Sequence, residues 1–168
     1  MVAFTAIMIL GLTMVLSPLI VWLWPSKKEA VATYRPTVEV QDEAGVLDST
    51  ALSDKLKNLE FRKQVHLAVL TVPGEDVSNL NDAVLEYARS HASDTDVPWV
   101  STSNPKYWSD GLVILAVAPD SRKVGCYFGE DVKVMSSQED AIQDAAKSQF
   151  REKDWDGGLA VSYTHLTL

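Results

Sequence analysis

Several patterns that mark familiar enzyme families are absent from this sequence. It contains no His-Glu-x-x-His zinc motif, no Gly-x-Ser-x-Gly nucleophile turn and no glycine-rich phosphate loop that ends in lysine. These absences exclude zincin-type metalloproteases, hydrolases with that serine turn, and P-loop nucleotide-binding proteins. The single cysteine, Cys126, excludes an intrachain disulfide and a multi-cysteine zinc site. Because Cys126 stands in an apolar segment, we expect a buried and unreactive thiol.

Basic residues are too few and too scattered to form a surface for nucleic acid. The formal net charge is -8, and basic residues come at most in short pairs such as Arg62-Lys63 and Arg122-Lys123. A protein that binds DNA or RNA phosphates needs a basic stripe or face. We therefore exclude nucleic acid as a partner.

The first part of the chain is a long uncharged hydrophobic run. Phe4 to Trp24 contains no charged residue, and a helix of that length covers roughly 30 Å, the thickness of a bilayer core. Tryptophans close the run, and Lys27 and Lys28 follow at the level of the lipid headgroups. We predict a transmembrane anchor over residues 1–25 and a linker over residues 26–36. The alternative is a cleavable signal peptide, although the run lacks a basic start and a small-residue cleavage site.

The rest of the chain alternates strand and helix patterns. Continuous or alternating apolar runs predict strands, and leucine, alanine and aromatic residues at helical spacing predict helices. Strands are predicted at residues 37–41, 65–72, 111–118 and 124–128, and helices at about 48–59, 78–88 and 137–155. A polar turn at 119–123 joins the last two strands as a hairpin. This order predicts one α/β domain over residues 37–160, with a mixed β-sheet flanked by helices.

The end of the chain does not continue this pattern. Residues 156–160 look like the start of a helix that does not develop. Residues 161–168 resemble a string produced when adapter sequence is read through into translation. We expect them to be a non-native tail of a truncated chain.

Four segments together resemble a known family. Val40–Leu47, Leu67–Val72, Asp110–Val117 and Gly129-Glu130 are similar in order and spacing to the TPM domain, which is named for a thylakoid lumen protein, a photosystem II repair protein and a nematode receptor-accessory protein. More narrowly, the chain resembles uncharacterised actinobacterial membrane proteins with a TPM-like domain. The resemblance implies a membrane-tethered α/β domain outside the cytoplasm, in accessory roles or with acid phosphatase activity.

The resemblance and the charge pattern disagree on topology. Lys27 and Lys28 follow the hydrophobic run and favour a cytoplasmic domain. The resemblance favours a single-pass protein of the cell membrane whose domain is extracytoplasmic, and this is our expectation. The segment from Trp99 to Trp108 departs from the family, since it lacks the glycine-containing pattern common before the third strand.

Acidic residues at the ends of the predicted strands are candidate metal ligands. Ca²⁺ and Mg²⁺ prefer oxygen ligands, and either ion can assist hydrolysis of a phosphoester. The candidates are Asp42, Glu43, Asp76, Asp110, Glu130 and Asp131. Asp42 and Asp110 rank first because the family also tends to have acids there. If the first and third strands are parallel, these two lie at opposite ends of the sheet. The alternative is that the acids only cap turns and face solvent.

Three aromatic residues in a long polar loop are candidate partner-binding residues. Trp99, Tyr107 and Trp108 have the side chains that dominate protein interfaces, although the loop can instead fold back so that its rings cover the sheet. His66 and His91 are interpreted as ordinary polar residues. We therefore predict an envelope accessory or interaction module with a membrane protein as partner. The alternative is a divalent-metal-dependent phosphatase acting on phosphomonoesters.

Overall fold

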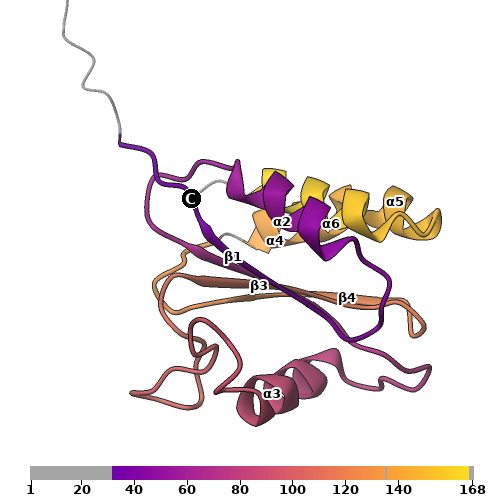
Figure 1. Cartoon of the computed structure of the whole chain (residues 1–168), viewed down its shortest axis with the longest axis horizontal. Helices are drawn as coiled ribbons and strands as arrows, with labels where there is room; N and C mark the ends of the chain where they lie inside the picture. Colours follow the sequence, from indigo (N-terminus) through magenta and orange to yellow (C-terminus); the bar gives the residue numbers. More distant parts are fainter. Residues whose placement is uncertain (1–31, 135, 167–168) are drawn as a thin grey trace, which may run out of the picture. The chain divides into compact units, whose positions relative to one another are not determined.

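Four apolar segments form one β-sheet (Figure 1). The computed structural model describes residues 32–134 and 136–166. The strands are β1 (Thr37–Asp42), β2 (His66–Thr71), β3 (Leu112–Ala118) and β4 (Lys123–Phe128). Every residue of β2 and β3 is buried, as expected for strands covered on both faces, and these two strands are central in the order β1-β2-β3-β4.

The sheet is mixed. β1, β2 and β3 run parallel, and β4 returns antiparallel to β3. This confirms the predicted mixed sheet and the predicted hairpin. We call the edge where the parallel strands end, after Asp42, Thr71 and Ala118, the carboxyl edge. The opposite edge, where they begin and where β4 ends, is the amino edge.

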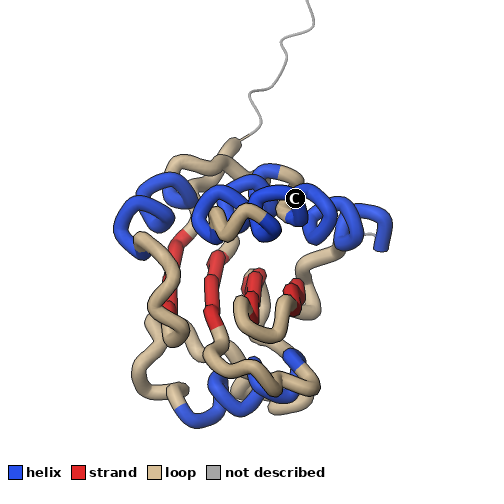
Figure 2. The backbone as a smooth tube through the Cα atoms, turned by 90° about the vertical axis from the view of Figure 1, so that its right-hand side faces the viewer, coloured by secondary structure: helices blue, strands red, loops and turns tan. Residues whose placement is uncertain are grey.

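Helices cover the two faces of the sheet unequally. The helices are α2 (Ser49–Lys57), α3 (Leu80–Ser90), α4 (Ser136–Ala145), α5 (Lys147–Arg151) and α6 (Trp155–Thr164). Four of them lie on one face of the sheet and α3 lies on the other, so the domain has three layers (Figures 1 and 2). Asp48 caps α2 by accepting from the Ala51 N–H, and Asn79 caps α3 by accepting from the Asn81 N–H.

The sheet separates two hydrophobic cores. In β3, Val113 and Leu115 face the four-helix side, whereas Leu112 and Ile114 face α3. Cys126 belongs to the first core, where burial and then the charge of Glu139 raise the pKa of its thiol to about 12. The expectation of a buried thiol is confirmed, and its raised pKa supports the expectation that it is unreactive.

Two helix predictions near the end of the chain are wrong. The segment predicted as one helix over 137–155 is divided into α4 and α5, and Lys153, with φ 63°, turns the chain before α6. The helix that was predicted not to develop is α6, which Asp154 caps by accepting from the Gly157 N–H. Its Tyr163 is buried. The non-native origin of residues 161–168 remains a sequence-based prediction.

The predicted anchor lies outside the described residues. Residues 1–31 contain all of it and most of the linker. Within residues 32–134 and 136–166, no helix has both the length and the hydrophobicity needed to cross a bilayer.

Candidate functional site

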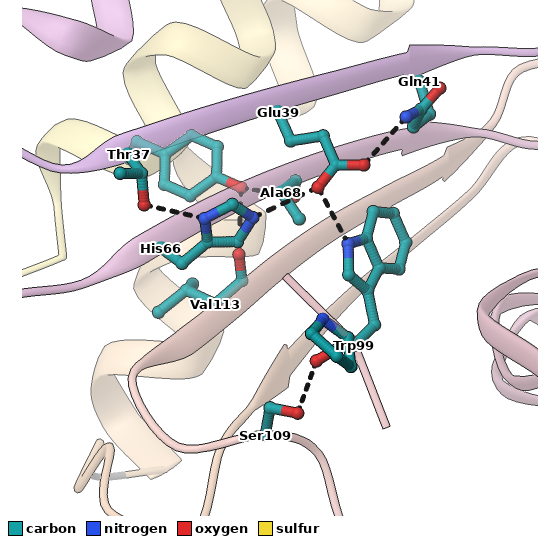
Figure 3. Close-up of polar contacts among 10 residues, drawn as sticks. Thr37, Glu39, Gln41, His66, Ala68, Trp99, Ser109 and Val113 are labelled. Carbon is teal, nitrogen blue, oxygen red and sulfur yellow. Dashed lines mark hydrogen bonds and ion pairs between the residues drawn. The ribbon is translucent and has the colours of Figure 1, made fainter. Parts of the chain in front are cut away.

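A buried polar cluster lies on the α3 side of β1 and β2 (Figure 3). Thr37 and Glu39 are two residues apart on β1, so both point to the same face, and Thr37 pairs with His66 of β2. Thr37 Oγ1 lies 2.7 Å from His66 Nδ1, and His66 Nε2 lies 3.2 Å from Glu39 Oε2. His66 is 5% exposed and Glu39 is 7% exposed. The register of two parallel strands thus aligns a hydroxyl, an imidazole and a carboxylate.

Two further side chains donate hydrogen bonds to the carboxylate of Glu39. Trp99 Nε1 donates to Oε2 at 3.2 Å, and Gln41 Nε2 donates to Oε1 at 2.8 Å. Burial raises the pKa of the Glu39 carboxyl, but the hydrogen bonds from His66, Gln41 and Trp99 outweigh burial and hold the pKa below its usual value. Glu39 is therefore an ionised group with a donor for each oxygen.

The aromatic residues of the long loop have different environments. Trp99 is fully buried and packs in the core next to α3. Trp108 is half-buried, and its ring centroid lies 5.5 Å from that of Tyr127. Tyr107 is 46% exposed. The loop thus folds back onto the sheet, and of the three candidate residues Tyr107 is the most exposed.

Three of the candidate metal ligands lie at the carboxyl edge. Asp42 accepts hydrogen bonds from the Val46 and Leu47 N–H groups and from the Thr71 hydroxyl, so it closes the turn after β1. Glu43 lines a hollow of about 260 Å³ beside α3. Asp76 lies in the segment after β2 and is exposed.

The other three acids lie at the amino edge. Asp110 precedes β3, and Glu130 and Asp131 follow β4. Asp131 accepts a 2.5 Å hydrogen bond from the Gly111 N–H and lies 3.5 Å from Lys63 Nζ. The six acids are therefore divided between two edges, with Asp42 and Asp110 at opposite ends. Among the described residues, no three His, Cys, Asp or Glu side chains are grouped so that they can hold a metal ion.

A basic cleft lies between the hairpin turn at the carboxyl edge and the last three helices. Its volume is about 540 Å³. Five of its ten lining residues are cationic, and none is acidic: the cations are Arg122, Lys123, Lys147, Arg151 and Lys153. Phe150 and Trp155, whose rings are stacked with centroids 5.4 Å apart, form an apolar part of the wall.

Two of the five cations in the cleft interact with other groups of the protein. Lys147 forms an ion pair with Asp144, and Lys123 Nζ donates a 2.5 Å hydrogen bond to the Ser78 carbonyl oxygen. Arg122, Arg151 and Lys153 are exposed and form no ion pair with any carboxylate in residues 32–134 and 136–166.

Two residues of the cleft have a positive φ, a backbone conformation that residues other than glycine rarely adopt. Arg122 has φ 54° and Lys153 has φ 63°, and these are the two non-glycine residues with positive φ in the described part of the chain. Such strained residues cluster at functional sites. Both line the basic cleft.

Sequence reasoning missed the polar cluster and the cleft. A signal for the first was present, because Thr37 and Glu39 alternate with valines and His66 begins a strand that is otherwise nearly all apolar. The signal for the cleft was the spacing of Lys147, Arg151 and Lys153 along one segment. Neither pattern identifies its partners without the tertiary fold.

Comparison with known proteins identifies a family. No curated protein matches the chain. Among solved structures, the chain is similar to the N-terminal domain of the cg2496 protein from Corynebacterium glutamicum, solved by NMR in solution, with 17% identity over 86% of this chain and 84% of that chain and a TM-score of 0.45. A family model described as "Domain of unknown function (DUF5129)" matches residues 40–165. Because that match spans most of the chain, the protein belongs to this family.

Proposed function

We propose that the domain is an interaction module that binds anionic groups in its basic cleft. The observation that carries the proposal is the local reversal of charge: five cations and no acid line one cleft in a chain with a net charge of -8. Scattered surface lysines and arginines serve solubility, but a concave cluster of one sign concentrates a ligand of the opposite sign.

The arrangement of the cleft favours a ligand with a phosphoryl or carboxylate group. Arg122 and Arg151 have the planar, five-donor guanidinium that matches either group. They come from the hairpin turn and from α5, so they approach a bound anion from two segments. The positive φ values at Arg122 and Lys153 close the hairpin turn and the end of α5, and these two turns bring both side chains to the cleft.

Direct titration tests this function. The full chain is titrated calorimetrically with inorganic pyrophosphate and, separately, with citrate, which distinguishes phosphoryl from carboxylate recognition. We expect saturable binding of one of these anions that weakens as sodium chloride is added. In the double variant Arg151→Gln/Lys153→Gln, Kd should rise at least about tenfold, which is about 1.4 kcal/mol.

A matched pair of substitutions controls for net charge. Arg62→Gln/Lys106→Gln removes two exposed cations that do not line the cleft, and its Kd should stay within about twofold of the unaltered chain. Equal weakening in both double variants, or no saturable binding of either anion, would contradict the proposal.

We further propose that this module is tethered to the cell membrane and faces away from the cytoplasm, as an accessory of an envelope membrane protein. The uncharged run from Phe4 to Trp24 and the resemblance to TPM-domain proteins support this proposal. Membrane fractions that retain the chain after an alkaline wash, and digestion of the domain by protease added to intact cells, are the expected results. A chain in the soluble fraction, or one protected from protease, would contradict it.

The divalent-metal-dependent phosphatase remains a sequence-based prediction. No contact among the described residues favours it over an anion-binding module.

A further inference from the structure

Thr37, His66 and Glu39 form a chain of hydrogen bonds that runs from the surface into the domain (Figure 3). His66 and Glu39 are buried, whereas Thr37 is exposed. A hydroxyl, an imidazole and a carboxylate in this order are the groups that activate a nucleophile in acyl-transfer enzymes. Of the three residues in this chain of hydrogen bonds, Thr37, which would react, is the exposed one.

The hydrogen-bond partners determine where the protons lie. Glu39 accepts from the Trp99 N–H and from the Gln41 amide, so both of its oxygens act as acceptors and the group is ionised. The hydrogen of His66 that faces Glu39 must then be on Nε2. In the neutral imidazole, Nδ1 presents a lone pair to the Thr37 hydroxyl at 2.7 Å. His66 is thereby oriented as a general base for Thr37.

The residue after Thr37 has a backbone N–H that could donate a hydrogen bond to the carbonyl oxygen of a substrate. β1 is an edge strand, and no described strand pairs with its outer side. The N–H of Thr37 donates to the Val65 carbonyl oxygen, toward β2, and neighbouring residues of a strand direct their N–H groups to opposite sides. The N–H of Val38 therefore points to the open side. A donor on the residue after the nucleophile is a recurring part of an oxyanion hole.

We propose that Thr37 is a nucleophile that accepts an acyl group from an activated carboxylic ester. A bond forms between Thr37 Oγ1 and the acyl carbon, and the bond from that carbon to the leaving-group oxygen breaks. The hydroxyl proton passes to His66 Nδ1 and from there to the leaving oxygen. Water then attacks the acyl-threonine with His66 again accepting the proton, which releases the carboxylic acid and restores the hydroxyl.

The exposure of Thr37 limits the class of substrate that the site can take. Thr37 lines neither the basic cleft nor the smaller hollow beside α3. Because Thr37 is exposed and lines neither of these two hollows, the ester that fits this proposal is reactive and has a small acyl group. This activity is independent of the anion-binding cleft, which lies at the opposite edge of the sheet.

Acetylation by p-nitrophenyl acetate tests the proposal. The full chain is incubated with this ester, nitrophenol release is followed, and acetylated peptides are identified by mass spectrometry. We expect an acetyl group on the peptide that contains Thr37. Thr37→Val abolishes this acetylation, and Thr37→Ser retains it. Thr102→Val, at an exposed threonine in the long loop, leaves it unchanged.

The base and its carboxylate partner are tested in the same assay. His66→Gln lowers the rate of acetylation by at least about a hundredfold, the contribution of a positioned general base. Glu39→Gln lowers the maximal rate without changing the half-saturating ester concentration, and circular dichroism checks the fold of both variants. Acetyl groups on lysines alone, or nitrophenol release by Thr37→Val at the unaltered rate, overturn the proposal.

Discussion

The indole N–H of Trp99 donates a hydrogen bond of 3.2 Å to Glu39 Oε2, which connects the long loop to an edge strand 60 residues earlier in the chain. Both side chains are buried, so the bond is shielded from water. Because the α3 face has a single helix, this loop is needed to cover the end of the sheet next to β1. The bond therefore links the position of the loop to the integrity of the polar cluster.

Replacing Trp99 with phenylalanine should lower the free energy of unfolding by about 2 kcal/mol. The substitution keeps an aromatic ring but removes a hydrogen bond to a buried charged group, and such bonds contribute about 1.5–3 kcal/mol. Urea denaturation measures the change. Trp108→Phe is the control, because the half-buried Trp108 ring forms no hydrogen bond with any residue that the structure describes. Equal losses in the two variants would show that ring size, and not the N–H, is responsible.

Glu39 should make the stability of the domain depend on pH in the acid range. Burial raises the pKa of the Glu39 carboxyl, but its hydrogen bonds hold the folded pKa below the ordinary value of 4.5, so the ionised form stabilises the fold above that pH. The stabilisation is lost as the pH falls from about 4.5 through the lower folded pKa. Urea denaturation at a series of pH values should show a smaller acid-range decrease for Glu39→Gln than for the unaltered chain. Glu60→Gln, at an exposed acid, should leave the profile unchanged.

Tyr163→Phe should lower the free energy of unfolding by about 1 kcal/mol. The Tyr163 hydroxyl is buried and donates a 2.7 Å hydrogen bond to the Ala68 carbonyl oxygen, and a bond of this kind contributes about 0.5–1.5 kcal/mol. Tyr107→Phe makes the same chemical change at an exposed position and should cost less than about 0.5 kcal/mol. Thermal or urea denaturation compares the two. A larger loss at Tyr107 would contradict the assignment of α6 to the core.

Lys153→Gly should stabilise the fold and weaken anion binding together. A non-glycine residue in the left-handed region costs about 1–2 kcal/mol, part of which glycine removes. We therefore expect the melting temperature to rise while the affinity for pyrophosphate or citrate falls. Lys133 lies outside both the cleft and the left-handed region, so Lys133→Gly should neither raise the melting temperature nor lower the affinity for the anion. Unchanged anion affinity in Lys153→Gly would mean that this lysine does not contact the ligand.

The central part of the fold was predictable because its signals are local. Strands β2 and β3 are continuous apolar runs, as strands buried on both faces must be, and the polar turn between β3 and β4 specifies a hairpin. The end of the chain was not predictable from local signals. Glycine at positions 157 and 158 weakens a helix, yet a Cβ at Gly158 would collide with the ring of Phe150. Tertiary packing thus requires a residue whose propensity argues against α6.

The candidate sites could not be assembled from the sequence. Thr37 and His66 become neighbours only through the register of β1 and β2, which no local pattern specifies. Arg122 reaches the cleft because the hairpin turn lies next to the last helices, and its left-handed backbone is not visible in the residue type. The candidate acids lie at the ends of strands, as the sequence indicates, and the parallel strands place Asp42 and Asp110 at opposite edges of the sheet.

The hydrogen bond from Tyr163 to Ala68 has a consequence for synthesis of the protein. It joins residues 95 positions apart, and Leu159 and Tyr163 complete the cover of a face that α2 and α4 cover only in part. Because α6 follows all four strands in the chain, the sheet is synthesised before the helix that completes this cover. The nascent chain therefore passes through a stage in which this face is incompletely covered and prone to aggregation, and the packing of α6 ends that stage.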